Sequence, residues 1–309
     1  MTDYHYKNKP EFKGTLSSPE KLPANSEDAT TWQQANKSFW ENNSMRYDWS
    51  EAIPYQEFTD GFYKEIDKRF FGAIWMVAPW KEAPFEQWLD FKTLKNKDVL
   101  EIGVGNGSHA QLIASRAKSY TGIDLTDYAV RSTTGRINLY GIPARILQMD
   151  AEKLQFPDAS FDFVWSWGVI HHSANTDNIL NEIARVLRPG GKSVIMVYYR
   201  SWYSYYLFAI LFGIFKGYFF KGKTIHQIIQ IRTDGALARY YTLNSWRKFV
   251  RKRLEIQRME VLGSKADLLP IPGSRLKTML LKPIPAWLTR FWLNNLKMGS
   301  FLICRLEKK

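Results

Sequence analysis

The chain has 309 residues, more than the roughly 100–200 of a usual single domain, so we expect one domain with elaborations and a full hydrophobic core. Aromatic residues make up 15% of the chain and include 12 Trp, which is more than a minimal core needs. Some of them are expected to line a ligand pocket or an interface. The single cysteine, Cys304, excludes an internal disulfide framework and, with no signal-like N-terminus, indicates a reducing, cytosolic setting.

The net charge of +13 is unevenly distributed. Residues 1–199 hold 22 Lys and Arg against 25 Asp and Glu, a net of −3, whereas residues 200–309 hold 21 against 5, a net of +16. A basic block of this kind indicates an anionic partner, such as a lipid headgroup, a phosphorylated substrate or a nucleic acid. A solvated basic face is the alternative.

The fold class predicted from the pattern is α/β, a doubly wound and mostly parallel sheet, because short apolar runs alternate with segments of helical spacing between residues 97 and 196. Five expected strands and three expected helices make up this core, and a further strand comes near the C-terminus. The strands are Asp98–Ile102, Ser119–Ile123, Arg145–Met149, Phe161–Ser166, Lys192–Tyr198 and Ser300–Leu306; the helices are Ser108–Lys118, Asp127–Leu139 and Thr176–Leu187. Pro189-Gly190-Gly191 is expected to stop the last helix.

This core divides the chain into five expected parts. They are a flexible tail at 1–35, a helical cap at 36–95, the α/β core at 96–200, an apolar lid insertion at 201–242, and the completion of the core at 243–309 with an irregular insertion near 265–295. The insertion is expected to be irregular because of its four prolines. The apolar stretch Trp202–Phe220 is interrupted by Lys216 and is shorter than the roughly 20 residues that a membrane span requires. It is interpreted as a lid, as an in-plane membrane-surface helix, or as a span.

A glycine-rich loop, "EIGVGNG", follows the first expected strand. Gly103, Gly105 and Gly107 allow the main chain to approach a ligand closely, as nucleotide-binding loops do. The spacing differs from the dinucleotide fingerprint, because Ser108 stands where that motif needs its last glycine, and no P-loop lysine is present.

Acidic residues at the ends of three successive strands further restrict the class of ligand. Glu101 would repel a pyrophosphate but attract an ammonium or sulfonium cation. Asp124 is placed to accept ribose hydroxyls, and Asp150 with Ala151 is placed to meet an adenine amino group. The pattern therefore predicts a phosphate-free nucleoside that carries an amino acid.

These residues resemble the class I S-adenosylmethionine-dependent methyltransferases. The resemblance covers roughly residues 98–198, through "VLEIGVGNGSHA", "GIDLT", "MDAEKLQFPDASFDFVWSWGVIHHS" and "VLRPGGK", in the family's order. It implies that S-adenosyl-L-methionine is the cofactor. Its binding residues would be Glu101 and the loop Gly103, Gly105, Asn106 and Gly107 for the methionine part, Asp124 and Leu125 for the ribose, Asp150 and Ala151 for the adenine, and Ser166 and Trp167 beside the acceptor.

The resemblance does not identify the acceptor. The Asn/Asp-Pro-Pro-Tyr box of amino-methylating relatives is missing, and "SWGVIHHS" instead resembles small-molecule and quinone-type C- or O-methyltransferases. His171 and His172 are the candidate catalytic bases, or else a pair that packs the loop. No metal site is expected, because no third ligand is evident near the two histidines.

Acceptor binding is expected outside the motif block. The aromatic or apolar segments concerned are 39–49, 70–80, 202–220 and 233–242. In the last one, Arg239, Tyr240 and Tyr241 are candidate substrate-binding residues, with Arg239 holding an anionic group of the acceptor. A plain helix start capped by Asp234 is the alternative.

The leading hypothesis is an enzyme that methylates oxygen or carbon of an apolar or lipid-linked small molecule. An RNA methyltransferase and a non-catalytic, methyltransferase-like partner protein are the alternatives, with nucleic acid the less favoured partner because long apolar stretches break the basic block. The expected location is cytoplasmic, with a peripheral position at an anionic membrane surface on its inner face.

Overall fold

The computed structural model describes residues 20–48, 51–269 and 275–309. Strand β1 (Asp98–Ile102) lies in the middle of one mixed sheet, whose strand order is β3-β2-β1-β4-β5-β8-β7. The other strands are β2 (Ser119–Asp124), β3 (Arg145–Gln148), β4 (Phe161–Trp167), β5 (Leu187–Tyr199), β6 (Tyr240–Tyr241), β7 (Glu255–Leu262) and β8 (Phe301–Glu307). Strands β1 to β5 are parallel, and β8 pairs antiparallel with both β5 and β7. The predicted doubly wound, mostly parallel α/β class is confirmed.

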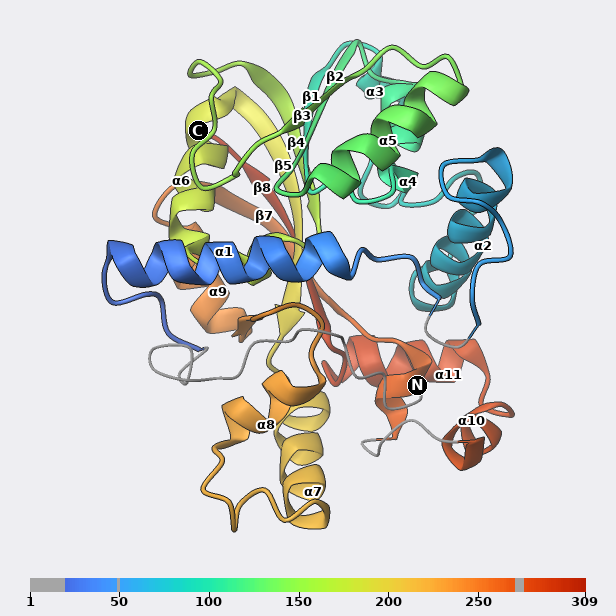
Figure 1. Cartoon of the computed structure of the whole chain (residues 1–309), viewed down its shortest axis with the longest axis vertical. Helices are drawn as coiled ribbons and strands as arrows, with labels where there is room; N and C mark the ends of the chain where they lie inside the picture. Colours follow the sequence, from blue (N-terminus) through green and yellow to red (C-terminus); the bar gives the residue numbers. More distant parts are fainter. Residues whose placement is uncertain (1–19, 49–50, 270–274) are drawn as a thin grey trace.

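Helices cover both faces of this sheet (Figure 1). One face packs against α6 (Thr176–Val186) and α9 (Leu243–Val250), and the other packs against α4 (Ser108–Ala114), with α5 (Asp127–Leu139) beside it. Two apolar clusters result, one around Leu100 and Ile195 and one around Val99 and Trp165, because neighbouring strand residues point to opposite faces. The sheet is thereby buried on both sides, as parallel sheets are.

The N-terminal helices are α1 (Ser26–Asn42), α2 (Asp60–Val77) and the short α3 (Phe91–Leu94). Helix α1 begins inside the stretch 1–35 that was expected to be a tail, and residues 1–19 lie outside the described ones. Its start has a physical cause: Asn25 accepts a hydrogen bond from the Asp28 amide, and acidic residues occupy the first turn. Trp32 and Phe39 form its buried face.

The Trp202–Phe220 stretch folds as a hairpin that stands away from the sheet (Figure 1). It comprises a π-helical turn η3 (Trp202–Leu207) and α7 (Phe208–Phe215), followed by α8 (Ile225–Arg232). Within the described residues, no helix has both the length and the apolar character needed to cross a membrane.

The stretch 265–295, expected to be irregular, is largely helical where it is described. It contains η4 (Lys265–Leu268), α10 (Arg275–Leu281), α11 (Ala286–Arg290) and η5 (Phe291–Asn295). Pro285 occupies the N-cap of α11, where the amide that proline lacks would have had no intrahelical partner. The proline therefore begins this helix instead of interrupting it. Pro270 and Pro272 lie outside the described residues.

Candidate active site

The glycine loop after β1 is open on its outer side. Gly103 and Gly105 have φ angles of +83° and +53°, which residues with a side chain rarely adopt. A Cβ atom on Gly103 would lie 2.2 Å from Val169 Cγ2, whereas a Cβ atom on Gly105 would meet nothing within 4 Å. The loop is thus packed at Gly103 and accessible at Gly105, where a ligand can approach the main chain. Gly107 immediately precedes α4.

Glu101, in β1, is a buried carboxylate beside this loop. Its Oε2 accepts a hydrogen bond of 2.6 Å from the Tyr120 hydroxyl, and its Oε1 has no hydrogen-bond partner among the described residues. Burial, together with the charge of Asp124, raises the pKa of Glu101 to about 8 against the effect of the Tyr120 hydrogen bond. His109 Nδ1 lies 3.7 Å from Oε1, but burial lowers the pKa of His109 to about 3, so this ring is neutral. Oε1 is therefore an acceptor suited to a donor or cation from a ligand.

Asp124, at the end of β2, is fixed by three donors. It accepts hydrogen bonds from the Gly105 amide at 3.2 Å and from the Thr126 amide and hydroxyl at 3.0 and 2.9 Å. Burial nevertheless raises the pKa of its carboxyl group. These contacts tie the end of β2 to the glycine loop, and the next residue, Leu125, lines the hollow where Asp150 lies.

Asp150 follows β3 and lines a hollow of about 320 Å³. Its Oδ1 accepts hydrogen bonds from the Glu152 amide and from Gln33 Nε2, both at 2.9 Å. Ala151, which follows it, packs against the core. A larger hollow of about 420 Å³, between α9, β7 and η5, contains none of the predicted site residues.

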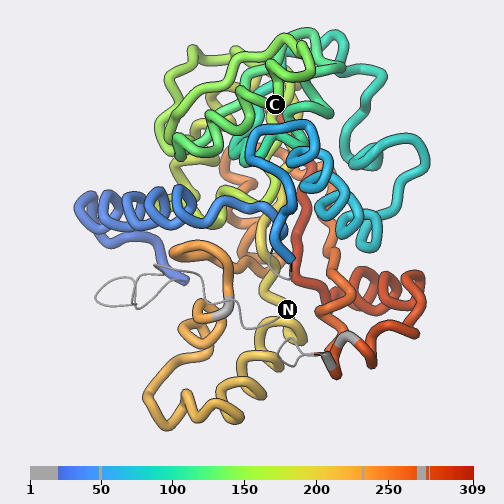
Figure 2. Tube along the Cα trace, turned by 45° about the vertical axis from the view of Figure 1, so that its right-hand side comes forward, coloured from blue at the N-terminus to red at the C-terminus, as the bar shows by residue number. Residues whose placement is uncertain are grey.

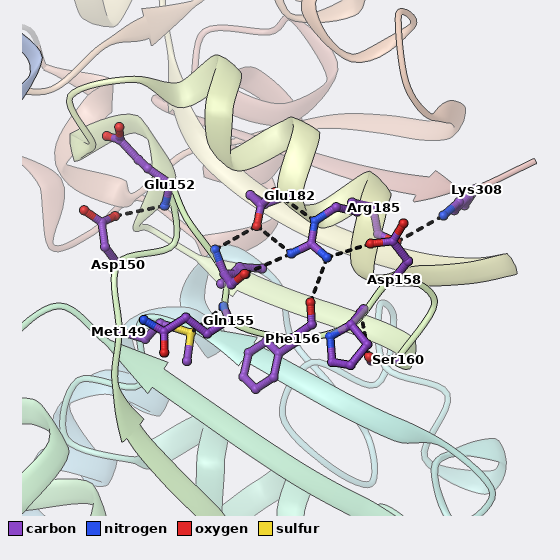
Figure 3. A network of polar contacts seen from close by, with 12 residues as sticks. Met149, Asp150, Glu152, Gln155, Phe156, Asp158, Ser160, Glu182, Arg185 and Lys308 are labelled. Atoms are coloured by element: carbon purple, nitrogen blue, oxygen red, sulfur yellow. Dashed lines mark hydrogen bonds and ion pairs between the residues drawn. The ribbon is translucent and has the colours of Figure 1, made fainter. Parts of the chain in front are cut away.

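A polar network holds the loop after Asp150 in place, as Figure 3 shows. The Arg185 guanidinium, on α6, donates to the carbonyl oxygens of Leu154 and Phe156 at 2.9 and 2.7 Å. It also pairs with Glu182 at 2.7 Å and with Asp158 at 2.8 Å. Because Glu182 in turn accepts the Leu154 amide, the loop is anchored to α6 from both sides.

Helix α1 lies across the carboxyl ends of the parallel strands (Figure 1). Gln33 bridges Asp150 and the Ala174 amide, and the Glu41 carboxylate accepts the amides of Asp127 and Tyr128 at 2.9 Å each. Glu41 thereby caps the first turn of α5 from outside that helix. The helix is a cover over the ribose and adenine side of the predicted site.

Three more predicted cofactor-binding residues have partners within the protein. Asn106 donates to the Met45 carbonyl at 2.8 Å and accepts from the Ser132 hydroxyl at 2.8 Å. Ser166 is buried and donates to the Ile102 carbonyl at 3.3 Å. Trp167, at the end of β4, stacks on Trp165 with 8° between the rings and 5.5 Å between their centroids.

The two histidines follow β4 in the turn η2 (Ile170–His172), and both are buried. His172 Nδ1 lies 2.8 Å from the Leu237 carbonyl oxygen. Neither ring nitrogen of His171 has a hydrogen-bond partner among the described residues, and its ring packs 3.9 Å from that of Tyr198. Burial, and then the neighbouring His172, lower the pKa of His171 well below its usual value, so its imidazole is neutral and its protonated form is disfavoured.

Arg239, Tyr240 and Tyr241 lie beside the histidine turn, and most of their polar groups have partners, but the buried Arg239 Nη2 has no hydrogen-bond partner among the described residues. The Arg239 amide donates to the His171 carbonyl at 2.8 Å, and its guanidinium donates to the Ser173 carbonyl at 2.6 Å. The hydroxyls of Tyr240 and Tyr241 bond to Thr233 and Thr176 at 2.7 and 3.0 Å. Burial lowers the pKa of Arg239.

Sequence reasoning missed the contribution of α1 and of Tyr120. The spacing of Trp32, Asn36 and Phe39 in α1 is a helical signal that could have indicated a cover. No local pattern identifies Tyr120 as the partner of Glu101, because the two meet only through the pairing of β1 with β2. In the described part of the chain, no group of three or more His, Cys, Asp or Glu side chains could hold a metal ion.

Comparison with known proteins connects this geometry to a family. Residues 100–195 match the family model described as a methyltransferase domain. The chain is 40% identical over 100 residues to a fatty-acid O-methyltransferase of Mycolicibacterium smegmatis, covering 32% of this chain and 36% of that protein. It is 38% identical over 100 residues to phthiotriol/phenolphthiotriol dimycocerosates methyltransferase 1 of Mycobacterium ulcerans, with the same coverage.

Among solved structures, the MccD protein is similar at 18% identity with a TM-score of 0.49, covering 73% of this chain and 96% of that chain. The chain spans little more than a third of the length of the two curated relatives. The match coincides with the strands that carry Glu101, Asp124, Asp150 and the glycine loop. The α/β core of this chain is therefore similar to methyltransferase domains, in keeping with the predicted resemblance to the class I S-adenosylmethionine-dependent methyltransferases.

Proposed function

We propose that this chain is an S-adenosylmethionine-dependent methyltransferase that acts on oxygen or carbon of an apolar or lipid-linked small molecule. The observation that carries the proposal is the buried Glu101 carboxylate, with its unpartnered Oε1, beside the open main chain at Gly105. A buried acid favours a cationic ligand and disfavours a phosphate. The residues present therefore fit a cofactor that carries an ammonium group and a sulfonium.

Each acidic residue would bind a different part of this cofactor. Glu101 would accept the ammonium group, Asp124 would accept the ribose hydroxyls, and Asp150 with Ala151 would bind the adenine. Asp124 is already held in place by Gly105 and Thr126, so its side chain would lose little conformational freedom when the cofactor binds. When bound, S-adenosylmethionine supplies a methyl group already activated on sulfur, so the protein needs chiefly to align the acceptor and exclude water.

The histidine turn would provide the base. His171 is neutral and buried, and it has free ring nitrogens among the described residues. It would take the proton from an acceptor hydroxyl or activated carbon as the methyl group moves, and a negative charge on the acceptor beside it would stabilise the imidazolium that burial otherwise disfavours. His172 would act by positioning this turn through its contact with the Leu237 carbonyl.

The proposed acceptor class is supported by two features. The two relatives named above carry names that refer to fatty acids and to dimycocerosates, and the hairpin beyond β5 exposes apolar side chains. Arg239 would meet an anionic group of the acceptor through Nη2, which has no hydrogen-bond partner among the described residues. An acceptor of this class would be presented at an anionic membrane surface.

Calorimetry with S-adenosylmethionine tests the cofactor assignment. The Asp124→Asn variant keeps the shape of the side chain but loses its charge, and we expect it to bind about tenfold or more weakly. Glu255→Gln, an exposed acid on β7, is the matched control and should bind like the unaltered protein. Equal affinity of Asp124→Asn and the unaltered protein would refute the assignment.

Isotopically labelled cofactor, incubated with the protein and host extract, tests the acceptor. Label in the lipid-extractable fraction is the expected result. Label in RNA would replace the proposal with RNA methylation. Cofactor binding without label transfer to any fraction would indicate a non-catalytic partner protein.

A further inference from the structure

The tip of the α7–α8 hairpin exposes large apolar side chains to solvent. Phe220 is 95% exposed and Phe215 is 79% exposed, and Ile214 beside them is also exposed. The inner side of the same hairpin is packed, because Phe212 of α7 and Ile228 of α8 are buried in one hydrophobic cluster. The hairpin is therefore an ordered element with one apolar face that no described residue covers.

A second apolar face lies on the α10–η5 segment, residues 275–295. Trp287 is 65% exposed and Met279 is 63% exposed, and Leu276 and Phe291 add to the same segment. Its inner side is packed through Leu281 and Leu293. Soluble proteins seldom expose so many large apolar residues together unless the surface binds something.

The two faces belong to one end of the molecule. Figures 1 and 2 show α7, α8, α10 and α11 at the same end, away from β3 and α5. Hydrogen bonds join the base of the hairpin to residues that flank the second segment on either side. Tyr203 Oη donates to the Leu268 carbonyl at 2.6 Å, and Ser204 Oγ donates to the Gly299 carbonyl at 3.0 Å.

The charged side chains within both segments have one sign. Lys216 and Lys221 flank the apolar tip and are exposed, as are Lys282 in the second segment and Lys297 just after it. No Asp or Glu occurs in residues 201–232 or 268–306. Apolar and aromatic groups beside lysines are the composition that binds the interface of an anionic bilayer.

We propose that the α7–α8 tip and the α10–η5 face together form a docking surface for a bilayer that contains anionic phospholipid. A second copy of the chain fits less well, because a symmetric contact would bring lysines against lysines with no acid in either segment to pair with them. RNA fits less well, because the exposed aliphatic side chains Ile214, Leu276 and Met279 neither stack on bases nor pair with phosphates.

This surface is placed to serve the site. Turn η3 begins directly after β5, so the hairpin leaves the sheet at the carboxyl edge, where Trp167 and the histidine turn also lie. As a device for presenting an amphiphilic acceptor, the surface rests on the proposed function. Its binding to vesicles, however, can be measured without any methyl transfer.

Vesicle flotation with the full chain tests the proposal. We expect binding to vesicles of phosphatidylcholine with about one third phosphatidylglycerol, and binding at least about tenfold weaker to phosphatidylcholine alone. Phe215→Ser/Phe220→Ser and, separately, Met279→Ser/Trp287→Ser should each weaken binding about tenfold. The control Tyr55→Ser/Leu139→Ser removes exposed aromatic and apolar side chains outside both segments and should bind like the unaltered protein.

Charge reversal at the tip tests the electrostatic part. Lys216→Glu/Lys221→Glu should weaken binding to anionic vesicles about tenfold or more, whereas Lys95→Glu/Lys153→Glu, on the α/β core, should not. No binding of the unaltered protein, or equal loss in tip and control variants, would overturn the proposal. A dimer that the tip variant dissociates, without vesicle binding, would assign the surface to a second copy. Calorimetry of each variant with S-adenosylmethionine separates these outcomes from failure of the cofactor site.

Discussion

The Glu101 carboxyl group is buried, accepts one hydrogen bond from Tyr120 and has one oxygen without a partner among the described residues. Binding of a cationic ligand at this group should therefore be coupled to the loss of its proton. Its pKa of about 8 lies above the ordinary value of 4.5, so the neutral form prevails near neutral pH in the ligand-free protein. The stability contributed by this shift is fully present below pH 4.5 and is lost as the pH rises through 8. A cationic ligand reverses the preference, because it favours the carboxylate.

We therefore expect S-adenosylmethionine binding to release close to one proton at pH 7, and the affinity to fall about tenfold per pH unit below 8. Calorimetry in buffers of different ionisation enthalpy measures the proton count. Glu101→Gln cannot titrate, so its proton release should be near zero and its affinity nearly independent of pH in this range. Proton release that is equal in both proteins would show that another group titrates.

Alanine variants at Gly103 and Gly105 should distinguish an effect on protein stability from an effect on cofactor binding. In Gly103→Ala the added Cβ meets Val169 at 2.2 Å with φ at +83°, so we expect a loss of about 2 kcal/mol or more of stability. In Gly105→Ala the Cβ meets open space, so only the backbone cost of about 1 kcal/mol applies. Thermal unfolding without ligand measures both.

Cofactor affinity should be reduced mainly in Gly105→Ala, the more stable of these two variants. If the cofactor lies against the main chain at Gly105, the Gly105→Ala variant should bind it at least about tenfold more weakly than the unaltered protein does, even though its Tm is higher than that of Gly103→Ala. Unchanged affinity in Gly105→Ala would place the cofactor elsewhere.

At the level of elements, α1 is attached to the core by few polar contacts, and Glu41 supplies two of them. Glu41→Ala would leave the amides of Asp127 and Tyr128 without this acceptor, at a cost of about 1 kcal/mol. A lower Tm and faster amide exchange in the first turn of α5 are expected. Ser38→Ala, on the exposed side of α1, is the control and should not lower the Tm. Equal exchange in both variants would contradict the role of Glu41 as an external cap.

The central elements could be predicted because their signals are local. Helix α5 has its predicted bounds, since Thr126 caps it and Tyr140 ends it, and β1 likewise matches its apolar run. Helix α4 ends at Ala114 instead of Lys118, because the Lys118 amide bonds to Leu94 and Lys97 in place of a helical partner. Strand β7 was not predicted, since its alternating charged residues become a strand only by pairing with β8.

The site could be predicted to the same extent. Glu101, Asp124 and Asp150 were predicted as site residues because strand ends and glycines mark them along the chain, and the structure places them in or just after β1, β2 and β3. Gln33 reaches Asp150 from 117 residues away, and no local pattern records that contact. Contacts of this kind depend on how α1 crosses the sheet, which tertiary packing decides.

Across the whole molecule, the predicted cofactor site with its acidic residues is separate from the proposed docking surface with its lysines. The site acid Glu101 is buried, whereas Lys216 and Lys221 are exposed, so dissolved salt screens only the latter effectively. Raising salt from about 0.05 to 0.5 M should weaken binding to anionic vesicles at least about tenfold and change S-adenosylmethionine affinity by less than about twofold. Parallel flotation and calorimetry titrations measure the two effects. A cofactor affinity that falls as steeply as vesicle binding would mean that the two charged regions are coupled.

The hairpin that leaves the sheet after β5 has a kinetic consequence if it rests on a bilayer. An enzyme held at the interface meets its acceptor in two dimensions, so its rate would follow the mole fraction of acceptor in the lipid and not the bulk concentration. Diluting the acceptor with inert lipid at constant total acceptor would then slow turnover. Such an enzyme could methylate many molecules on one vesicle before it exchanges to the next.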